Sequence, residues 1–163
     1  MIVFKKAISK DDYLQIEALA DVIWRDHYIP MVGKPQIDYM LDNFQSASAI
    51  EKQIATGLEY YLLIYNQVPI GYVAIKKEAE ALFLSKIYVL KDYRGKNIGK
   101  ETISFVEEKA KIYQLSAIRL TVNINNESAI AFYKKAGFII SRPLVADIGN
   151  GFVMDDYEML KLL

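Results

Sequence analysis

The chain has 163 residues, of which 53% are hydrophobic and 25% are charged, and its formal net charge is zero. A chain of this length can bury a substantial core, so we expect residues 1–163 to form a single domain. The balanced charge disfavours a nucleic-acid or acidic-membrane partner, because such proteins carry a basic excess. Cysteine is absent and His27 is the one histidine. This excludes disulfides, a cysteine nucleophile and a multi-histidine metal site, so we expect no metal.

Two features of the sequence bear on where the protein is found. The N-terminal residues Met1-Ile-Val-Phe-Lys-Lys lack the charged region, apolar core and cleavage site of a signal peptide. The apolar run Tyr60–Tyr65 is far too short to span a bilayer. We therefore expect a cytoplasmic protein with no membrane partner.

The N-terminal third predicts one strand and then helices. Ile2–Lys6 is typical of a strand. Ser9 and Asp12 have the spacing of a capping box, which predicts a helix beginning there. The apolar face of this helix comprises Ile16, Leu19, Ala20 and Ile23. Residues 25–34, which include Pro30, break the periodicity and predict a loop.

Two shorter helices are expected next. Pro35 begins the first of them, because proline favours the first turn of a helix. Its apolar face comprises Ile37, Met40, Leu41 and Phe44. Ser48 is the predicted cap of the second, which carries Ile50 and Ile54 and ends at Gly57.

Three strands should follow. Glu59–Tyr65 and Val68–Lys77 predict a hairpin around Asn66-Gln67, and Leu82–Leu90 reads as the next strand. After this strand comes Tyr93–Lys100, a basic loop of sequence Tyr-Arg-Gly-Lys-Asn-Ile-Gly-Lys.

The loop at 93–100 precedes a segment with helical spacing, Ile98–Tyr113. A strand, a glycine-containing loop and a helix N-terminus together make an anion site, because loop N–H groups and the helix dipole favour negative charge. Arg94, Lys96 and Lys100 add full positive charges, so a phosphate or pyrophosphate is the expected ligand. The spacing fits neither the Walker loop nor the dinucleotide fingerprint. A basic, solvated turn is the alternative interpretation.

A second motif covers residues 120–138. Ala117–Val122 predicts a strand, and Asn125 or Asn126 would cap a helix over Glu127–Ala136. One face of this helix comprises Ala129, Phe132, Tyr133 and Ala136. Gly137 ends it in the position that glycine favours after a helix. Taken alone, Phe132 and Tyr133 could be simple core aromatics.

The C-terminal residues predict two more strands, near Phe138–Ala146 and Phe152–Leu162, with a turn at 147–151 between them. Early helices, a meander of antiparallel strands and a final β-α-β-α-β order indicate an α+β fold. We expect a mixed, mostly antiparallel central sheet of about seven strands flanked by helices.

Both motifs resemble those of the GNAT superfamily of acetyl-CoA-dependent N-acetyltransferases, bacterial type. The loop is similar to the signature Gln/Arg-x-x-Gly-x-Gly/Ala, with Arg94 first, Gly99 last and Asn97 in place of the middle glycine. Asparagine tolerates positive φ, although its side chain narrows the room for a phosphate. The second motif is similar to Asn-x-x-Ala-x-x-Phe-Tyr-x-x-x-Gly-Phe. Its matching residues are Asn126, Ala129, Phe132, Tyr133, Gly137 and Phe138.

The resemblance implies a GNAT fold over 1–163 and a binding site for acetyl-CoA, the expected co-substrate. In the family, the strand before the loop, here Ser85–Val89, carries a bulge and splays from the next strand, Ala117–Val122. The main chain of the first strand then pairs with the cofactor. The residues implied to bind the cofactor are Ile87, Tyr88, Val89, Arg94, Gly95, Lys96, Asn97, Ile98, Gly99, Lys100, Asn126 and Tyr133.

The resemblance implies catalytic or substrate-binding roles for only a few residues. The resemblance implies that Tyr133 is the general acid, because a phenol with an ordinary pKa near 10 is protonated at neutral pH and can donate to sulfur. Asn126 would contact the pantetheine arm or order its own loop. Of the side chains that could face the acceptor, His27, Tyr28 and Asp155 are the predicted substrate residues. Tyr88, Asp156 and Glu158 are further candidates, and no general base is assigned.

The expected reaction is direct transfer of an acetyl group to a primary amine of a small molecule, with a polyamine preferred. The preference rests on a loose similarity to a GNAT branch that includes polyamine acetyltransferases. The residues that carry it are Trp24, His27, Tyr28, Pro30, Tyr39, Met40, Met154, Asp155, Asp156 and Tyr157. A protein N-terminus or lysine acceptor is the alternative within the enzyme class, and a non-catalytic acyl-CoA sensor is the alternative outside it. A homodimer is a further expectation.

Overall fold

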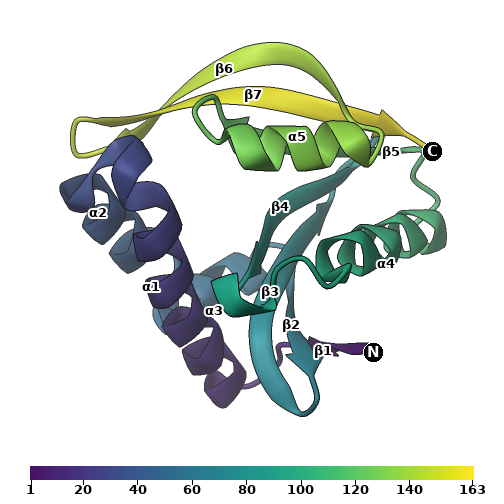
Figure 1. Cartoon of the computed structure of the whole chain (residues 1–163), viewed down its shortest axis with the longest axis horizontal. Coiled ribbons are helices and arrows are strands. Elements are labelled where there is room, and N and C mark those ends of the chain that lie inside the picture. The colour runs from purple at the N-terminus through teal and green to yellow at the C-terminus, as the bar shows by residue number, and fades with distance from the viewer.

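The computed structural model describes residues 1–163 and has one seven-stranded sheet with helices on both faces (Figure 1). The strand order is β1-β2-β3-β4-β5-β7-β6. All neighbouring strands are antiparallel except β4 and β5, which run parallel. This arrangement confirms the predicted α+β class and the mixed, mostly antiparallel sheet.

The strands are β1 (Ile2–Lys6), β2 (Leu58–Tyr65), β3 (Val68–Lys77), β4 (Leu82–Val89), β5 (Ala117–Asn123), β6 (Ile139–Gly149) and β7 (Phe152–Leu162). The helices are α1 (Lys10–Val32), α2 (Lys34–Phe44), α3 (Ala47–Ala55), α4 (Ile98–Ile112) and α5 (Glu127–Lys135), with one 3₁₀ turn, η1 (Lys91–Tyr93). None of these helices is both long enough and apolar enough to cross a membrane.

Two apolar cores hold the helices to opposite faces of the sheet. On one face, α1, α2 and α3 pack against Tyr60, Leu62 and Tyr72. On the other face, α4 and the Tyr133 side chain of α5 pack against strand residues that include Leu63 and Val73. Alternation along each strand assigns neighbouring residues to different cores, as Leu62 and Leu63 show.

The β2–β3 hairpin forms as predicted. Asn66 and Gln67 have φ values of 48° and 66°, as a two-residue turn between twisted strands requires. Gly137, with φ of 101°, follows α5 in the left-handed conformation expected after a helix.

The predicted loop at 25–34 is wrong, because α1 continues through Pro30 to Val32. Proline removes one main-chain donor, but contacts made by the last two turns outweigh that loss. His27 is hydrogen-bonded to Asn126, and the Tyr28 hydroxyl to that of Tyr88. Tertiary contacts thus extend the helix beyond the point where its apolar period ends.

Two boundaries also differ from the prediction. Ser46, not Ser48, caps α3, because its side chain accepts a hydrogen bond from the Ala49 N–H. Strand β6 continues to Gly149, so the final turn is shorter than the predicted segment at 147–151.

The sheet is split between β4 and β5. Only two residue pairs join these strands, Leu82 with Ile118 and Phe83 with Arg119. Beyond them, the pairing of β4 with β3 shifts by one residue, which makes Ser85 the extra residue of a bulge. The predicted splay of the two central strands is therefore present, and it opens a gap in the middle of the sheet.

Candidate functional site

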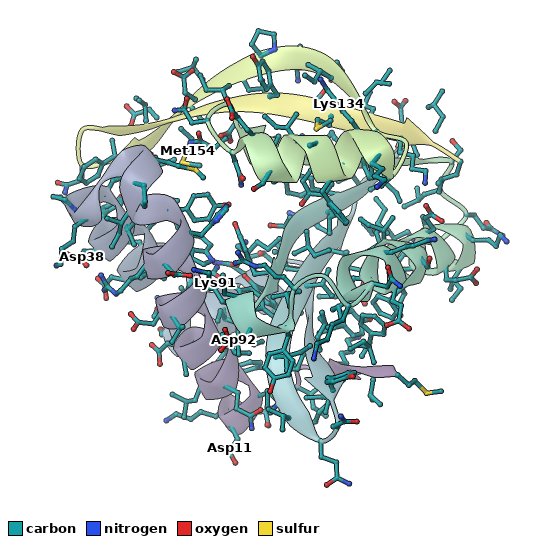
Figure 2. All side chains as sticks on the ribbon, in the orientation of Figure 1. Asp11, Asp38, Lys91, Asp92, Lys134 and Met154 are labelled. Carbon is teal, nitrogen blue, oxygen red and sulfur yellow. The ribbon has the colours of Figure 1, made fainter.

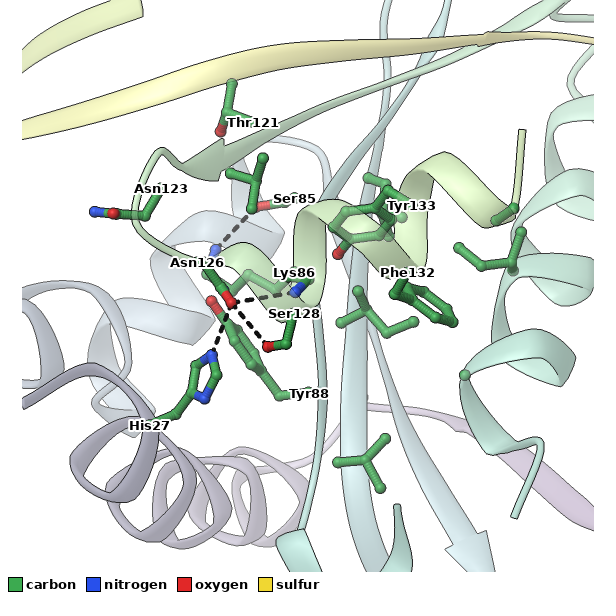
Figure 3. Close-up of a pocket in the computed structure, with 18 of the residues that line it drawn as sticks. His27, Ser85, Lys86, Tyr88, Thr121, Asn123, Asn126, Ser128, Phe132 and Tyr133 are labelled. Carbon is green, nitrogen blue, oxygen red and sulfur yellow. Dashed lines mark hydrogen bonds between the residues drawn. The ribbon is translucent and has the colours of Figure 1, made fainter. Parts of the chain in front are cut away.

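A cavity of about 1010 Å³ lies at the gap between β4 and β5 (Figure 3). Its wall includes the loop before α4 and the start of α5 on one side of the sheet, residues of α1 on the other side, and residues of strand β7. Alternation along β4 gives the gap two sides. Ile87 packs with the core that holds α4 and α5, and Tyr88 with the core that holds α1. The cavity therefore joins two chambers through the split sheet.

The loop before α4 presents a row of free main-chain donors. Asn97 adopts the left-handed conformation, with φ of 60°, and its side chain does not cap the helix. None of the N–H groups of residues 95–100 donates to a protein acceptor. Free donors at a helix N-terminus favour an anion. Asparagine thus keeps the turn that glycine makes in the related signature.

The charged residues of this loop divide into two groups. Arg94 and Lys100 line the cavity, and the Arg94 Nε donates to the Val89 carbonyl at 3.1 Å. Lys96 is not part of the cavity wall. Its ammonium lies 5.6 Å from the centre of the Tyr93 ring and 5.7 Å from that of Tyr65. The Lys96 ammonium thus lies beside aromatic rings, and the contact of Lys96 with the ligand stays a prediction.

The two glycines of the loop serve different purposes. Gly95 has φ of 81° and open space around it, which leaves room for a ligand against the main chain. Gly99 packs on the Phe132 ring of α5, where an added Cβ would lie 2.9 Å from two ring carbons. Gly99 therefore allows the start of α4 to approach α5.

Main-chain groups of β4 point in alternate directions. The Leu90 N–H donates to Ile70 on β3, so the groups of Tyr88, two residues earlier, also face β3. Those of Ile87 and Val89 face the gap, where β5 no longer pairs with them. Tyr88 was predicted to offer its main chain to the cofactor, but it contributes its side chain to the cavity wall instead.

Tyr133 lies on α5 with its ring buried against the sheet and its hydroxyl in the cavity (Figure 3). The hydroxyl forms no hydrogen bond within the protein, so it is free to donate to a ligand. Burial, and to a lesser degree the neighbouring Tyr28, raises the pKa of Tyr133 above its ordinary value of 10. The group is therefore protonated at neutral pH.

Asn126 organises the start of α5. Its Oδ1 accepts hydrogen bonds from the Ala129 N–H and the Ser128 hydroxyl, both at 3.3 Å. The His27 Nε2 lies 3.1 Å from the same oxygen (Figure 3). Because Oδ1 only accepts, Nε2 carries the proton and donates. His27 thus connects α1 to the helix that bears Tyr133.

Aromatic side chains form the wall on the α1 side. The Tyr28 and Tyr88 hydroxyls are 3.0 Å apart, and the Trp24 Nε1 donates to the Tyr72 hydroxyl at 2.9 Å. Met154 of β7 adds an apolar contact beside α1 and α2 (Figure 2). The hydroxyl groups of Tyr28, Tyr88 and Tyr72 and the Trp24 Nε1 are thus already paired within this wall.

The acidic candidates on β7 do not lie together. Neighbouring strand residues face opposite sides, so Asp156 lines the cavity while Asp155, a predicted substrate residue, is exposed outside it. Glu158 is paired with Arg119 and Arg142 and takes no part in the site. Of the three acidic candidates on β7, Asp156 is thus the one that lines the cavity.

Sequence reasoning missed Lys86 and Ser85. Both line the cavity, and the Lys86 Nζ donates to the Ser85 Oγ at 2.9 Å. A polar pair within the apolar strand Leu82–Val89 was the available signal. Thr121 and Asn123 of β5, also missed, line the cavity near them (Figure 3).

Residues 16–138 match the model of the acetyltransferase (GNAT) family. This match spans most of the chain. The chain belongs to the GNAT acetyltransferase family. The predicted resemblance is thus confirmed, and with it the prediction of an acyltransferase domain.

Individual relatives agree with this family. An uncharacterized N-acetyltransferase of Methanocaldococcus jannaschii is 31% identical over 86 residues, which are 48% of this chain and 38% of that protein. The match therefore spans well under half of that relative's length. PaiA N-acetyltransferase from Thermoplasma acidophilum, solved in complex with coenzyme A, is 21% identical with a TM-score of 0.85. That alignment covers 100% of this chain and 99% of the other.

A third relative has a different kind of ligand. Naa50 from Arabidopsis thaliana, solved with the bisubstrate analogue CoA-Ac-MVNAL, is 24% identical with a TM-score of 0.69 and covers 99% of each chain. At these identities the structural similarity establishes the fold alone.

The GNAT site has the features that acetyl-CoA requires. The free N–H groups of residues 95–100 suit a pyrophosphate, with Arg94 and Lys100 beside them. The unpaired edge of β4 at Ile87 and Val89 suits the amides of a pantetheine arm. Open space at Gly95 leaves these donors accessible. The donor set and the cavity therefore fit the co-substrate that the family uses.

Proposed function

We propose that this GNAT protein transfers an acetyl group from acetyl-CoA directly to the primary amine of a small molecule. One observation carries the proposal: the cavity joins the anion-binding loop to a polar chamber through the split in the sheet, with the Tyr133 hydroxyl in its wall. The chain has no cysteine, so no thiol can hold the acyl group between donor and acceptor.

Each part of the site has a task in this reaction. Bound acetyl-CoA supplies an acyl carbon that an amine can attack; a C–N bond forms, the C–S bond breaks, one proton leaves nitrogen and one reaches sulfur. The N–H groups of Ile87 and Val89 face the gap, where one of them can polarise a carbonyl oxygen. The unpaired Tyr133 hydroxyl donates to the leaving sulfur.

Contacts at the far end of the chamber favour a small acceptor over a peptide. A peptide needs an open groove between α2 and the β6–β7 hairpin. Here the Tyr39 hydroxyl donates to the Ile148 carbonyl at 2.8 Å, and the Gln36 Nε2 to the Val153 carbonyl at 3.1 Å. These bonds join α2 to the hairpin across the position of such a groove.

A peptide or protein amine is the second candidate acceptor, because Naa50 shares the fold and binds an analogue with a peptide portion. A polyamine is the first expectation among small amines, and Asp156 supplies one acidic group for it. A sensor without turnover is the third candidate, and the free Tyr133 hydroxyl argues against it.

Calorimetric titration with acetyl-CoA, CoA and ATP tests the donor site first. We expect saturable binding of both CoA species and weak binding of ATP. Thiol release is then measured with a panel of small amines and with short peptides that have free N-termini. Release with small amines alone supports the proposal, release with peptides alone favours the second candidate, and binding without any release favours the sensor.

The same samples test the expected homodimer. Strand β6 is an edge strand with exposed Ile139 and Val145, which gives a second copy an apolar surface to pair with. Light scattering coupled to gel filtration reports the mass in solution, and a monomer at all concentrations would exclude this pairing.

A further inference from the structure

The chamber on the α1 side of the gap contains two charged side chains of opposite sign. Lys86 comes from β4 and Asp156 from β7, and both line the cavity. No ion pair joins them, and neither has an opposite charge within 4.0 Å. A charge removed from water without a partner is costly, so a ligand that supplies both partners would bind favourably.

The bulge in β4 directs Lys86 into this chamber. Because Ser85 is the extra residue, Lys86 pairs with Ala74, and its ammonium Nζ lies 5.6 Å from the centre of the Tyr60 ring. Its one hydrogen bond is to the Ser85 hydroxyl, which is neutral. Two of the three ammonium donors therefore make no hydrogen bond within the protein, and no carboxylate neutralises the charge.

Asp156 approaches from the opposite wall. Its Oδ1 is buried and has no hydrogen-bond partner, the one such side-chain atom in the protein. Burial, together with the neighbouring Asp155, raises the pKa of Asp156 to about 6, so it remains a carboxylate at neutral pH. An ammonium group of a ligand would satisfy this oxygen and offset its desolvation.

We propose that the acceptor carries a carboxylate as well as its primary amine, with the amine held near Asp156 and the carboxylate at Lys86. This inference rests on the proposed function and specifies its substrate as an amino acid, in place of the polyamine expected from the sequence. A polyamine would bring further positive charge to Lys86 and leave that ammonium unpaired. A free amino acid supplies one group of each sign.

Matched acceptor pairs test the inference directly. Each pair differs by one carboxylate: glycine and methylamine, γ-aminobutyrate and propylamine, ornithine and putrescine. We expect the carboxylated member of at least one pair to have a kcat/KM at least about 10-fold higher, since a hydrogen bond between charged groups contributes that much or more. The pair with the largest ratio of kcat/KM then indicates how far apart the sites for the amine and the carboxylate lie.

Two variants test whether the preference for the carboxylated acceptor depends on the charge of Lys86. Lys86→Met keeps the apolar stem and removes the charge, so we expect the ratio of kcat/KM between the carboxylated acceptor and its plain amine to fall to near unity. Lys86→Arg keeps the charge and should retain a preference. Lys52→Met, on the exposed surface of α3, is the matched control and should behave as wild type.

Asp156 is tested in the same panel. Asp156→Asn should raise KM for both members of a pair, because it removes the partner of the amine they share, and the exposed Asp155→Asn is its control. Thermal unfolding and acetyl-CoA titration of every variant show whether it is folded.

The outcomes separate this inference from the proposed function. Equal rates within every wild-type pair, or faster acetylation of the plain amines, would overturn the inference while the proposed function stands. A carboxylate preference that survives in Lys86→Met would also overturn it. If acetyl-CoA binds and no amine of either kind is acetylated, the proposed function itself fails.

Discussion

At the scale of single residues, Tyr133 shows how burial can prepare a hydrogen-bond donor. Its ring is held by the core and its hydroxyl is unpaired, so Tyr133→Phe removes one donor and leaves the packing unchanged. We expect kcat to fall by about 100-fold or more, which is typical for the loss of an acid, with little change in acetyl-CoA affinity. Steady-state thiol release and calorimetry measure the two quantities. Full turnover by a folded variant would remove Tyr133 from the mechanism.

His27 acts through a neighbour in this geometry. Its hydrogen bond to Asn126 helps to fix the start of α5, two turns before Tyr133. We expect His27→Gln, which retains a donor, to keep more activity than His27→Ala. If His27 were the general base, both variants would instead lose the same limb of the pH profile for kcat/KM. The pH profile therefore distinguishes a positioning role from proton abstraction.

Lys86 gives the acceptor preference a pH dependence. Burial lowers the pKa of its ammonium to about 8, so the free enzyme carries this charge below pH 8 and loses it above. The ratio of kcat/KM for a carboxylated acceptor to that for its plain amine should therefore fall as pH rises through 8. Deprotonation of the acceptor amine affects both rates and largely cancels in the ratio. Lys86→Met should show a flat ratio from pH 7 to 9.

At the scale of elements, the position of β4 depends on Gly71 of β3. An added Cβ at Gly71 would lie 2.2 Å from the Tyr88 carbonyl oxygen, a main-chain atom that cannot rotate away. We expect Gly71→Ala to displace β4, to cost about 1–3 kcal/mol of stability as overpacking does, and to weaken acetyl-CoA binding.

Gly57→Ala is the control for this displacement. Gly57 has φ of 114°, so alanine there is strained and lowers stability, but it does not touch β4. Chemical denaturation and calorimetry should show loss of stability in both variants and loss of binding in Gly71→Ala alone. Equal binding in both would mean that the edge of β4 does not hold the co-substrate.

Elements with a clear local signal were predictable from the sequence, and so was the family. Two apolar runs on either side of Asn66-Gln67 indicated the β2–β3 hairpin, and the loop before α4 was recognisable from its glycines and basic residues. The continuation of α1 through Pro30 was not, because contacts of His27 and Tyr28 with distant elements hold the helix. The choice between Asp155 and Asp156 depended on which strand face meets the cavity, which is a property of the sheet. Lys86 could not be recognised as a site residue within an apolar strand, because the bulge that directs it into the chamber has no sequence signal.

At the scale of the whole molecule, the sheet consists of two parts joined by two residue pairs between β4 and β5. A co-substrate that pairs with the free edge of β4 and reaches the loop before α4 would connect these parts. Binding to the native state alone stabilises a protein by about 2.7 kcal/mol at a concentration 100 times Kd. Protection of main-chain N–H groups from hydrogen exchange should therefore increase most beside the gap between β4 and β5.

Hydrogen exchange with and without acetyl-CoA measures this effect. We expect slower exchange at Ile87 and Val89 of β4, in residues 95–100 and in the end of β5 from Thr121, where β4 and β5 no longer pair or the main-chain donors have no partner in the protein. The β1–β2 pair, which is fully paired and remote from the gap, should change least. Protection spread evenly over the sheet would mean that the ligand acts only through global stability. Protection absent from the gap would place the co-substrate elsewhere.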